Sequence, residues 1–344
     1  MLRRSKLNLN YANKGKLETL DMLMDEMTRA VNLFIDVLWA KQDFTSKYTD
    51  FKVDTWLSAR LQQCLGKQAI GIIKNQKKKK KKTKPFFKGK SFTLNANVVD
   101  LQYDNNTFDV WLRLWCLGKK LQLKLPSKKH KQFNKFVTWE QSGTVRLRRT
   151  KDKSFSVDVL FEKKTPLTKK KGKTVGVDVG YKKLLVTSTG KVIDDGLEAI
   201  YEKIAQKKQG SKAFKRALIE RDNLINQSLN KLSFHDVREV VCEDLKNVKR
   251  GSKGKIRKKF NNKLQRWSYP KVLSKLSRLT DEHKVLLTRA NPAYTSQKCS
   301  LCGATCKANR KGEAYTCACG NKMDADLNAA INLSHMGLYS AHAL

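Results

Sequence analysis

Acidic residues are scarce in this sequence. Its 344 residues include 31 Asp and Glu against 72 Lys and Arg, which gives a formal net charge of +41 at pH 7. Repulsion among so many like charges disfavours a chain that works alone, so a polyanionic partner is expected, with nucleic acid as the first candidate. At 40% hydrophobic residues the chain can still build two or three modest domains, which argues against a disordered protein.

Long apolar runs are also missing. No stretch approaches the roughly 18 apolar residues that span a bilayer, and the basic residues 1–6 do not lead into the apolar segment of a secretory signal. A basic protein of the membrane surface is the alternative, and the lack of an amphipathic terminal segment weakens it. We therefore expect a soluble, intracellular protein with no membrane partner.

Five of the eight cysteines cluster near the C-terminus. A reducing compartment argues against disulfides, and Cys64, Cys116 and Cys242 lie among apolar neighbours, which predicts plain core residues. The other five fall between positions 299 and 319, in a pattern close to the two knuckles of a zinc ribbon.

The knuckles differ in spacing. Cys299-Ser-Leu-Cys302-Gly is a C-x₂-C pair, and 14 residues later Cys317-Ala-Cys319-Gly is a shorter C-x-C pair. We expect these four cysteines to hold a structural Zn²⁺. Cys306 is the substitute ligand if Cys317 and Cys319 cannot both bind, and a group of free thiols is the alternative to a metal site.

The first half of the chain divides into a helical and a β-rich stretch. Residues 5–10 alternate as a strand does, and apolar residues recur with helical spacing over 16–40 and roughly 54–74. Six lysines at 77–82 predict either a solvated linker or a phosphate-binding loop. Short alternating segments over 86–162 indicate a small β-barrel or sandwich. Its aromatic residues, including Phe108, Trp111, Trp115 and Trp139, are interpreted as core rather than as base-stacking platforms.

A basic linker, 163–173, leads into the second half. There the pattern predicts strands at 174–179, 183–188, 191–194, 237–242 and 285–287, a broken helical region over 197–232, and helices near 260–280 and 326–335. Strands interleaved with helices in this order favour a mixed sheet with helices on its faces.

Three carboxylates of this second half are the candidate catalytic residues. Asp178 and Glu243 each end an apolar strand, so adjacent strands could bring them together from 65 residues apart, and Asp326 opens the last helix. Carboxylate oxygens suit Mg²⁺ or Mn²⁺, and phosphodiester cleavage uses two such ions about 3.5–4 Å apart. Asp244 is expected to face away from Glu243, and Asp324 is expected to cap or brace the helix rather than bind metal.

These motifs resemble the TnpB family of transposon-encoded, RNA-guided DNA nucleases, to which the miniature type V CRISPR effectors are similar. Val175-Gly-Val-Asp-Val-Gly180, Val241-Cys-Glu-Asp-Leu-Lys-Asn247 and the stretch from Tyr294 to Asn332 match the family's carboxylate and cysteine signatures. The resemblance implies an α/β RNase H-like (RuvC-like) nuclease core with an inserted zinc ribbon, preceded by a β-barrel wedge domain that carries a small helical recognition insert.

The implied boundaries cover the whole chain. They are 1–15 for the first wedge strand, 16–84 for the helical insert, 85–165 for the wedge barrel, 166–173 for a linker, and 174–344 for the core with its ribbon at 295–323. Catalytic metal would be held by Asp178, Glu243 and Asp326. The partners would be a guide RNA and a double-stranded DNA target. The protein would be cytoplasmic and nucleoid-associated, in a prokaryotic or phage context.

A basic segment without acidic residues follows Glu243 and predicts a nucleic-acid contact. The candidates are Lys249, Arg250, Lys253, Lys255, Arg257, Lys258, Lys259, Arg266 and Trp267. A mobile surface loop is the alternative, and Trp267 could stack on a base or anchor the following helix.

The sequence thus predicts an RNA-guided, metal-dependent DNA endonuclease. The rival hypotheses are an unguided transposase or resolvase, since RNase H-like cores also transfer strands, and a guided DNA-binding protein whose carboxylates no longer act.

Overall fold

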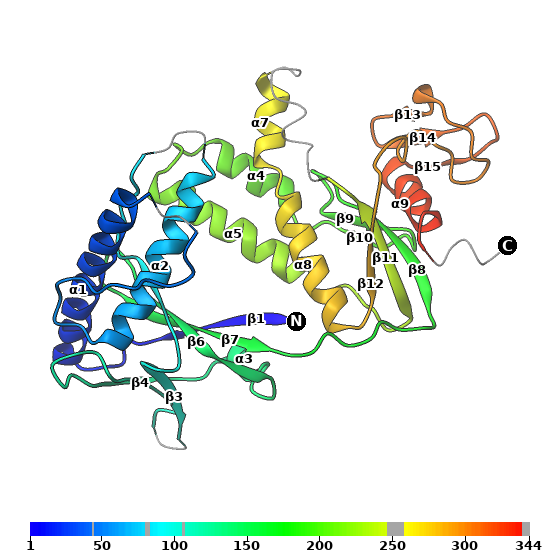
Figure 1. The fold of residues 1–344 in the computed structure, drawn as a ribbon. Helices are drawn as coiled ribbons and strands as arrows, with labels where there is room; N and C mark the ends of the chain where they lie inside the picture. Colours follow the sequence, from blue (N-terminus) through cyan, green and yellow to red (C-terminus); the bar gives the residue numbers. More distant parts are fainter. Residues whose placement is uncertain (43–44, 80–82, 105–106, 246–257, 339–344) are drawn as a thin grey trace. The chain divides into compact units, whose positions relative to one another are not determined.

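A computed structural model of the chain describes residues 1–42, 45–79, 83–104, 107–245 and 258–338, with the helical backbone alone at 258–260 (Figure 1). The described residues form two compact units, Met1–Lys164 and Thr165–Leu344. The finer division of the first unit into a helical insert and a closed wedge barrel stays a prediction. No helix in the described ranges is long and apolar enough to cross a membrane.

The first unit contains two antiparallel sheets and two long helices. One sheet has the order β1 (Leu2–Asn8), β7 (Phe155–Glu162), β6 (Glu140–Arg149), β2 (Ser91–Leu94). The other has the order β3 (Val99–Tyr103), β4 (Val110–Leu114), β5 (Leu123–Ser127). The helices are α1 (Lys14–Ala40), α2 (Ala59–Lys77) and the short α3 (Lys131–Asn134).

Side-chain caps set where the two long helices begin. Asn13 accepts a hydrogen bond from the backbone N–H of Lys16 at the start of α1, and Ser58 accepts one from Leu61 at the start of α2. The predicted start of the second helix near residue 54 was therefore too early, because the serine that can satisfy the free N–H groups lies at position 58.

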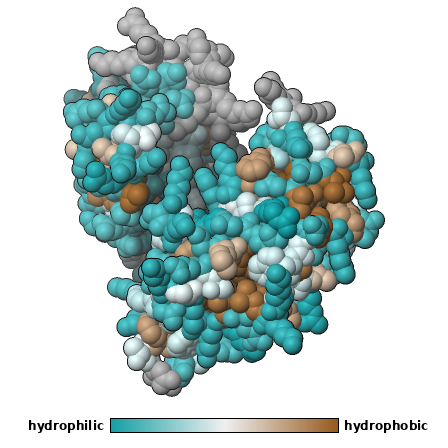
Figure 2. Space-filling view, turned by 90° about the vertical axis from the view of Figure 1, so that its left-hand side faces the viewer, coloured by the Kyte–Doolittle hydropathy of each residue, from teal (hydrophilic) through white to brown (hydrophobic). Residues whose placement is uncertain are grey.

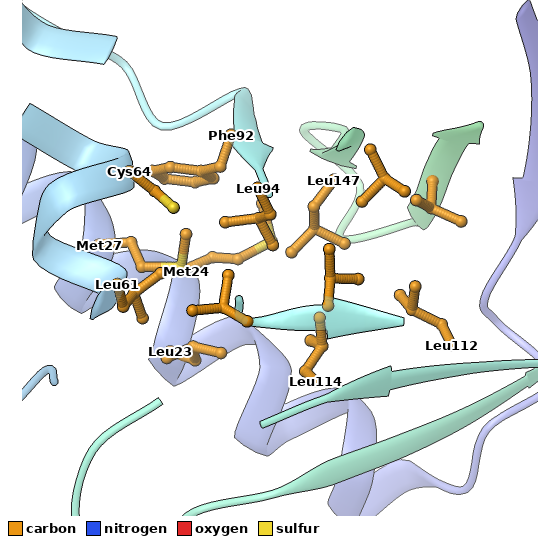
Figure 3. Close-up of a cluster of buried hydrophobic side chains, with 14 of the residues drawn as sticks. Leu23, Met24, Met27, Leu61, Cys64, Phe92, Leu94, Leu112, Leu114 and Leu147 are labelled. Carbon is orange, nitrogen blue, oxygen red and sulfur yellow. The ribbon is translucent and has the colours of Figure 1, made fainter. Parts of the chain in front are cut away.

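Both helices share one core with strands of both sheets. Figure 3 shows side chains of α1, α2, β2, β4 and β6 pointing toward one another, among them Met24, Leu61, Phe92, Leu112 and Leu147. Cys64 belongs to this core, as predicted, and Cys116 is half-buried at its edge. Around the core, the face shown in Figure 2 is mostly hydrophilic, with apolar residues in small separate patches.

The interpretation of the β-region aromatics as core was wrong for three of the four. Trp139 packs against the core. Phe108, Trp111 and Trp115 are not part of it. On β4 the alternating residues Val110, Leu112 and Leu114 fill the buried face, which leaves Trp111 on the opposite one. Phe108 and Trp115 lie just outside the strand.

The second unit is built on a five-stranded mixed sheet, as predicted. Its order is β10 (Val192–Ile193), β9 (Leu185–Thr187), β8 (Lys173–Asp178), β11 (Val237–Glu243), β12 (Leu286–Ala290). The last three strands run parallel to one another. The helices are α4 (Leu197–Ala205), α5 (Lys212–Leu229), α7 (Lys258–Arg266), α8 (Tyr269–Glu282) and α9 (Ala325–His335).

Helices cover both faces of this sheet, with α8 on one side and α9 on the other (Figure 1). Val175 and Val177 of β8 pack in the cluster that contains α4, α5 and α8 residues. Gly176 between them faces α9. A Cβ atom there would lie 1.9 Å from the carbonyl oxygen of Ala330 and 2.5 Å from the backbone nitrogen of Ser334. Only glycine allows α9 to lie this close to the strand.

A methyl group at Gly176 should therefore displace α9. We expect Gly176→Ala to lower the free energy of unfolding by about 2–3 kcal/mol and to speed amide hydrogen exchange in residues 325–335, measured by mass spectrometry. Gly71→Ala is the matched control, because an added Cβ there meets nothing within 4 Å. Unchanged protection of α9 in Gly176→Ala would contradict the packing account.

Candidate active site

The strand order brings the first two carboxylates together. β8 and β11 are parallel neighbours in a register that pairs Val177 with Cys242, so Asp178 and Glu243 end adjacent strands at the same edge of the sheet. α9, packed on β8 at Gly176, adds Asp326 in its first turn. Asp244 is not among the residues that line the resulting cavity.

The three carboxylates line one cavity of about 980 Å³. Its other walls combine aromatic, basic and small residues. The full lining consists of Asp178, Val179, Gly180, Tyr181, Lys182, Glu243, Lys263, Leu264, Trp267, Pro292, Thr295, Ser296, Arg310, Gly312, Glu313, Asp326 and Ala329.

Burial and like charge disfavour ionisation at this site. Burial raises the pKa of Asp178 to about 7, and the charges of Glu243 and Asp326 add to the shift. Burial also raises the pKa of Glu243, against the opposing effect of a hydrogen bond from Thr295 and of the Arg310 charge. A divalent cation would relieve both the burial cost and the repulsion, so the hard-oxygen donor set fits Mg²⁺ or Mn²⁺.

Protein donors hold the carboxylates in place. The Thr295 hydroxyl donates to Glu243 Oε1 at 2.5 Å. Asp326 accepts a hydrogen bond from Arg310 at 3.0 Å, and Lys183 Nζ lies 3.7 Å from its second oxygen. In the described part of the chain, only the four cysteines gather three or more potential ligand atoms closely enough for one ion. The carboxylate oxygens are thus farther apart than a single ion would hold them.

Asp324 is a helix cap, as expected. Its Oδ1 accepts hydrogen bonds from the backbone N–H groups of Asp326 at 3.0 Å and Leu327 at 3.2 Å. Its second oxygen pairs with Lys183. Despite the opposing effect of burial, Lys183 and these N–H groups lower the pKa of Asp324. Asp324 therefore orients the first turn of α9, while Asp326 faces the cavity.

The cysteine cluster uses both residues of the C-x-C pair. The sulfur atoms of Cys299, Cys302, Cys317 and Cys319 all lie within 4.8 Å of one another, and Cys306 is not part of the group. Two of the sulfur pairs, Cys299–Cys319 and Cys302–Cys317, are each 3.7 Å apart. Four sulfurs around Zn²⁺ at about 2.3 Å would be spaced by roughly 3.8 Å. The site therefore fits a tetrahedral zinc ion.

The first knuckle also favours a thiolate. Burial works against the charge on Cys299, but backbone N–H groups of Cys302 and Leu301 and the amide of Asn321 lower its pKa to about 6. Asn321 Nδ2 lies 3.3 Å from the sulfur. Such donors stabilise the deprotonated sulfur that a zinc ion requires.

Two buried asparagines, to which the sequence interpretation gave no role, join the knuckle to α9. Asn328 accepts from the backbone N–H of Ser300 at 3.0 Å and donates to the carbonyl of Lys298 at 2.8 Å. Asn332 donates to the carbonyls of Lys298 at 2.7 Å and Thr295 at 2.9 Å. Because they are four residues apart on a predicted helix, the sequence indicates that both lie on one face of it, and this was the signal from which their shared role could have been predicted. Lys183, Arg310 and Thr295 were also missed, since the sequence does not show that they approach the carboxylates.

The predicted nucleic-acid contacts are only partly described. Lys249, Arg250, Lys253, Lys255 and Arg257 lie outside the described residues, and Lys258 and Lys259 lie in α7 with side chains that are not described. Trp267 lines the cavity, and its indole N–H donates to the carbonyl of Gly180 at 2.8 Å. Arg266 is half-buried beside it but does not line the cavity.

The geometry predicts which cysteines bind metal. Protein purified without chelators should carry close to one zinc per chain, measured by inductively coupled plasma mass spectrometry. Cys299→Ser or Cys302→Ser should lose the zinc and unfold the region 295–325, because metal-binding energy at such sites is folding energy.

Cys306→Ser is the matched control and should keep its zinc, since Cys306 lies outside the four-sulfur group. Fresh protein without zinc, or loss of zinc from Cys306→Ser, would contradict the assignment.

Several known proteins are similar to this chain in sequence or in fold. The family profile described as "Cas12f1-like, TNB domain" matches residues 269–333. The chain is 37% identical over 97 residues to the CRISPR-associated endodeoxyribonuclease Cas12f1 of Sulfoacidibacillus thermotolerans, covering 28% of this chain and 21% of that protein. It is 37% identical over 109 residues to a TnpB-like protein of Aquifex aeolicus, covering 30% and 34%. These matches span a fifth to a third of the relatives' length.

A solved Cas12f1–sgRNA–target DNA complex has a similar fold. The TM-score is 0.63 at 15% identity, and the match covers 94% of this chain and 83% of the other. At this identity the likeness concerns the fold alone. The family profile over 269–333 and the sequence matches over about 30% of the chain support a place among TnpB-like proteins and miniature Cas12 effectors.

Proposed function

We propose that this protein is an RNA-guided, divalent-metal-dependent DNA endonuclease. The observation that carries the proposal is the convergence of Asp178, Glu243 and Asp326 on one cavity, from two parallel strand ends and a helix start. A surface cluster of acids would keep ordinary pKa values, whereas Asp178 has a pKa of about 7 because of burial and its two neighbours.

The three carboxylates would hold Mg²⁺ or Mn²⁺, which would activate the attacking water and stabilise the leaving oxygen of the phosphodiester. The chain's own residues would do the positioning. Thr295 fixes one oxygen of Glu243, and Arg310 and Lys183 fix Asp326. Because the positively charged side chains of Arg310 and Lys183 lie next to Asp326, they would also attract the phosphate of an incoming strand.

Another part of the cavity lining, which includes Tyr181, Lys263 and Trp267, suits a nucleic-acid strand. Tyr181 stacks on Tyr201 at 4.6 Å between ring centres, and the ammonium of Lys263 lies 5.2 Å from the Tyr181 ring centre. Trp267 is fixed beside them by its hydrogen bond to Gly180. A basic and aromatic lining in the same cavity as the carboxylates is suited to a sugar–phosphate chain with unpaired bases.

The proposal of an RNA guide and a DNA target rests on the similar proteins and on the net charge of this chain. The similar Cas12f1 structure is a complex with sgRNA and target DNA, and the matching relative from Sulfoacidibacillus is named an endodeoxyribonuclease. A net charge of +41 suits a protein that holds both nucleic acids. Base pairing with the RNA would read the target sequence, so the protein itself would read only a short flanking motif.

The neighbouring aspartates provide the test. Asp326→Ala should abolish Mg²⁺-dependent DNA cleavage and leave RNA and target binding nearly intact, because it removes a metal ligand. Asp324→Ala should cost about 1 kcal/mol of stability and keep much of the activity, because it removes a cap. Cleavage is followed on a plasmid target, and binding by gel shift.

Both variants must be folded and equal in zinc content for the comparison to count. An active Asp326→Ala, or an inactive Asp324→Ala beside it, would overturn the assignment. Sequencing the RNA that co-purifies separates the rivals: one discrete RNA species is expected for a guided enzyme, and its absence would favour an unguided strand transferase.

A further inference from the structure

The face of β11 that meets α9 carries a fully buried carboxylate. Successive strand residues point to opposite faces of a sheet, so Glu239, Val241 and Glu243 share one face of β11. On this face Val241 packs against Leu333 of α9. Glu239 is 0% exposed and precedes the candidate metal ligand Glu243 by four residues. Glu239 does not line the cavity, so it is not itself a candidate metal ligand.

Donors on both neighbouring strands and at the end of α9 hold the Glu239 carboxylate. The Thr288 hydroxyl of β12 donates to Oε1 at 2.6 Å, and the Thr174 hydroxyl of β8 donates to Oε2 at 3.2 Å. The backbone N–H of Leu338, shortly after the end of α9, donates to Oε1 at 2.9 Å. Glu239 thereby joins the three parallel strands of the sheet to the C-terminal end of α9.

A second glycine allows this contact. A Cβ atom at Gly337 would lie 2.6 Å from Glu239 Oε2 and 2.6 Å from Thr174 Cγ2, so a side chain there would push the end of α9 off the sheet. A carboxylate at the C-terminal end of a helix is repelled by the helix dipole. Its charge therefore does not explain why Glu239 lies there. What Glu239 supplies is a set of hydrogen bonds with fixed directions.

We infer that Glu239 is a positioning residue for the candidate metal site. It fixes the C-terminal end of α9 on the sheet and so holds Asp326, in the first turn of the helix, near Asp178 and Glu243. The inference rests on the proposed function, in which these three carboxylates hold the metal. The 11 residues of α9 span about 16 Å, so a tilt of about 5° at one end would move the other end by roughly 1 Å. A displacement of this size is enough to impair a catalytic site.

The asparagines of α9 bind a different part of the chain. Asn328 and Asn332 hydrogen-bond to backbone groups of residues 295–300, at the first cysteine knuckle. They tie α9 to the cysteine cluster, whereas Glu239 ties it to the sheet that carries Asp178 and Glu243. Glu239 thus adds a directed link between the helix that brings one carboxylate and the strands that bring the other two.

The test measures Mn²⁺ binding by the full-length protein, freed of nucleic acid at high salt, so that no cleavage enters it. Bound Mn²⁺ is quantified by the loss of the electron paramagnetic resonance signal of the free ion, and Asp326→Ala gives the background from ions bound elsewhere. Glu239→Ala should bind Mn²⁺ about tenfold more weakly than the wild type. Glu239→Gln should stay close to wild type, because its carbonyl can accept from Thr288 and Leu338 and its amide can donate to the Thr174 hydroxyl.

Val240→Ala is the matched control and should bind Mn²⁺ as the wild type does. Val240 is the next residue of β11 and is buried on the opposite face of the sheet, in the cluster that contains α8 residues. Its truncation destabilises the same strand without touching the contact with α9. Equal weakening in Val240→Ala and Glu239→Ala, or a tenfold loss of affinity in Glu239→Gln, would overturn the inference.

Thr288→Val keeps the inference testable if Glu239→Ala fails to fold. It removes the shortest of the three hydrogen bonds and keeps nearly the same side-chain shape, so Mn²⁺ binding should weaken roughly threefold. Unchanged affinity in Thr288→Val would then contradict the inference. Wild-type affinity in Glu239→Ala would overturn the inference alone. A wild type that binds no Mn²⁺ beyond the Asp326→Ala background would overturn the proposed function and the inference with it.

Discussion

The close approach of α9 to β8 is the contact on which the candidate active site depends. Gly176 has no side chain, so the helix backbone at Ala330 and Ser334 can lie directly on the strand two residues before Asp178. That contact carries Asp326, in the first turn of the helix, to the edge of the sheet where Asp178 and Glu243 already stand. Asp178, Glu243 and Asp326 are distant in sequence, and they line one cavity because Gly176 has no side chain that would hold α9 away from β8.

Hydrogen bonds connect the cysteine cluster and the three carboxylates into one structure. Asn328 and Asn332 tie α9 to the first cysteine knuckle, Asn332 also binds the carbonyl of Thr295, and the Thr295 hydroxyl holds Glu243. Arg310, on the ribbon strand β13 (Arg310–Lys311), reaches Asp326. A metal bound by the four cysteines would therefore also help to position the candidate catalytic carboxylates, although these cysteines do not line the cavity.

The sequence predicts those parts of the site that depend on local pattern. Asp178 and Glu243 end apolar runs, and parallel pairing then places them side by side. The zinc ligands stayed open between Cys306 and the C-x-C pair, because sequence spacing does not give sulfur distances. Arg310 and Lys183 were missed for the same reason. The alternation in β4 was visible, but which of its two faces meets the helices depends on tertiary packing.

RNA-directed cleavage is the central claim, and it is measured most directly with a reprogrammed guide. The protein is loaded with its co-purifying RNA, whose guide segment is changed to match a chosen plasmid sequence placed beside randomised flanking DNA, and Mg²⁺ is added. We predict cleavage of plasmids that carry the matching sequence next to a restricted set of flanks, and none of plasmids with a scrambled match. Cleavage that ignores the match, or no cleavage by zinc-loaded, RNA-bound protein, would contradict the account.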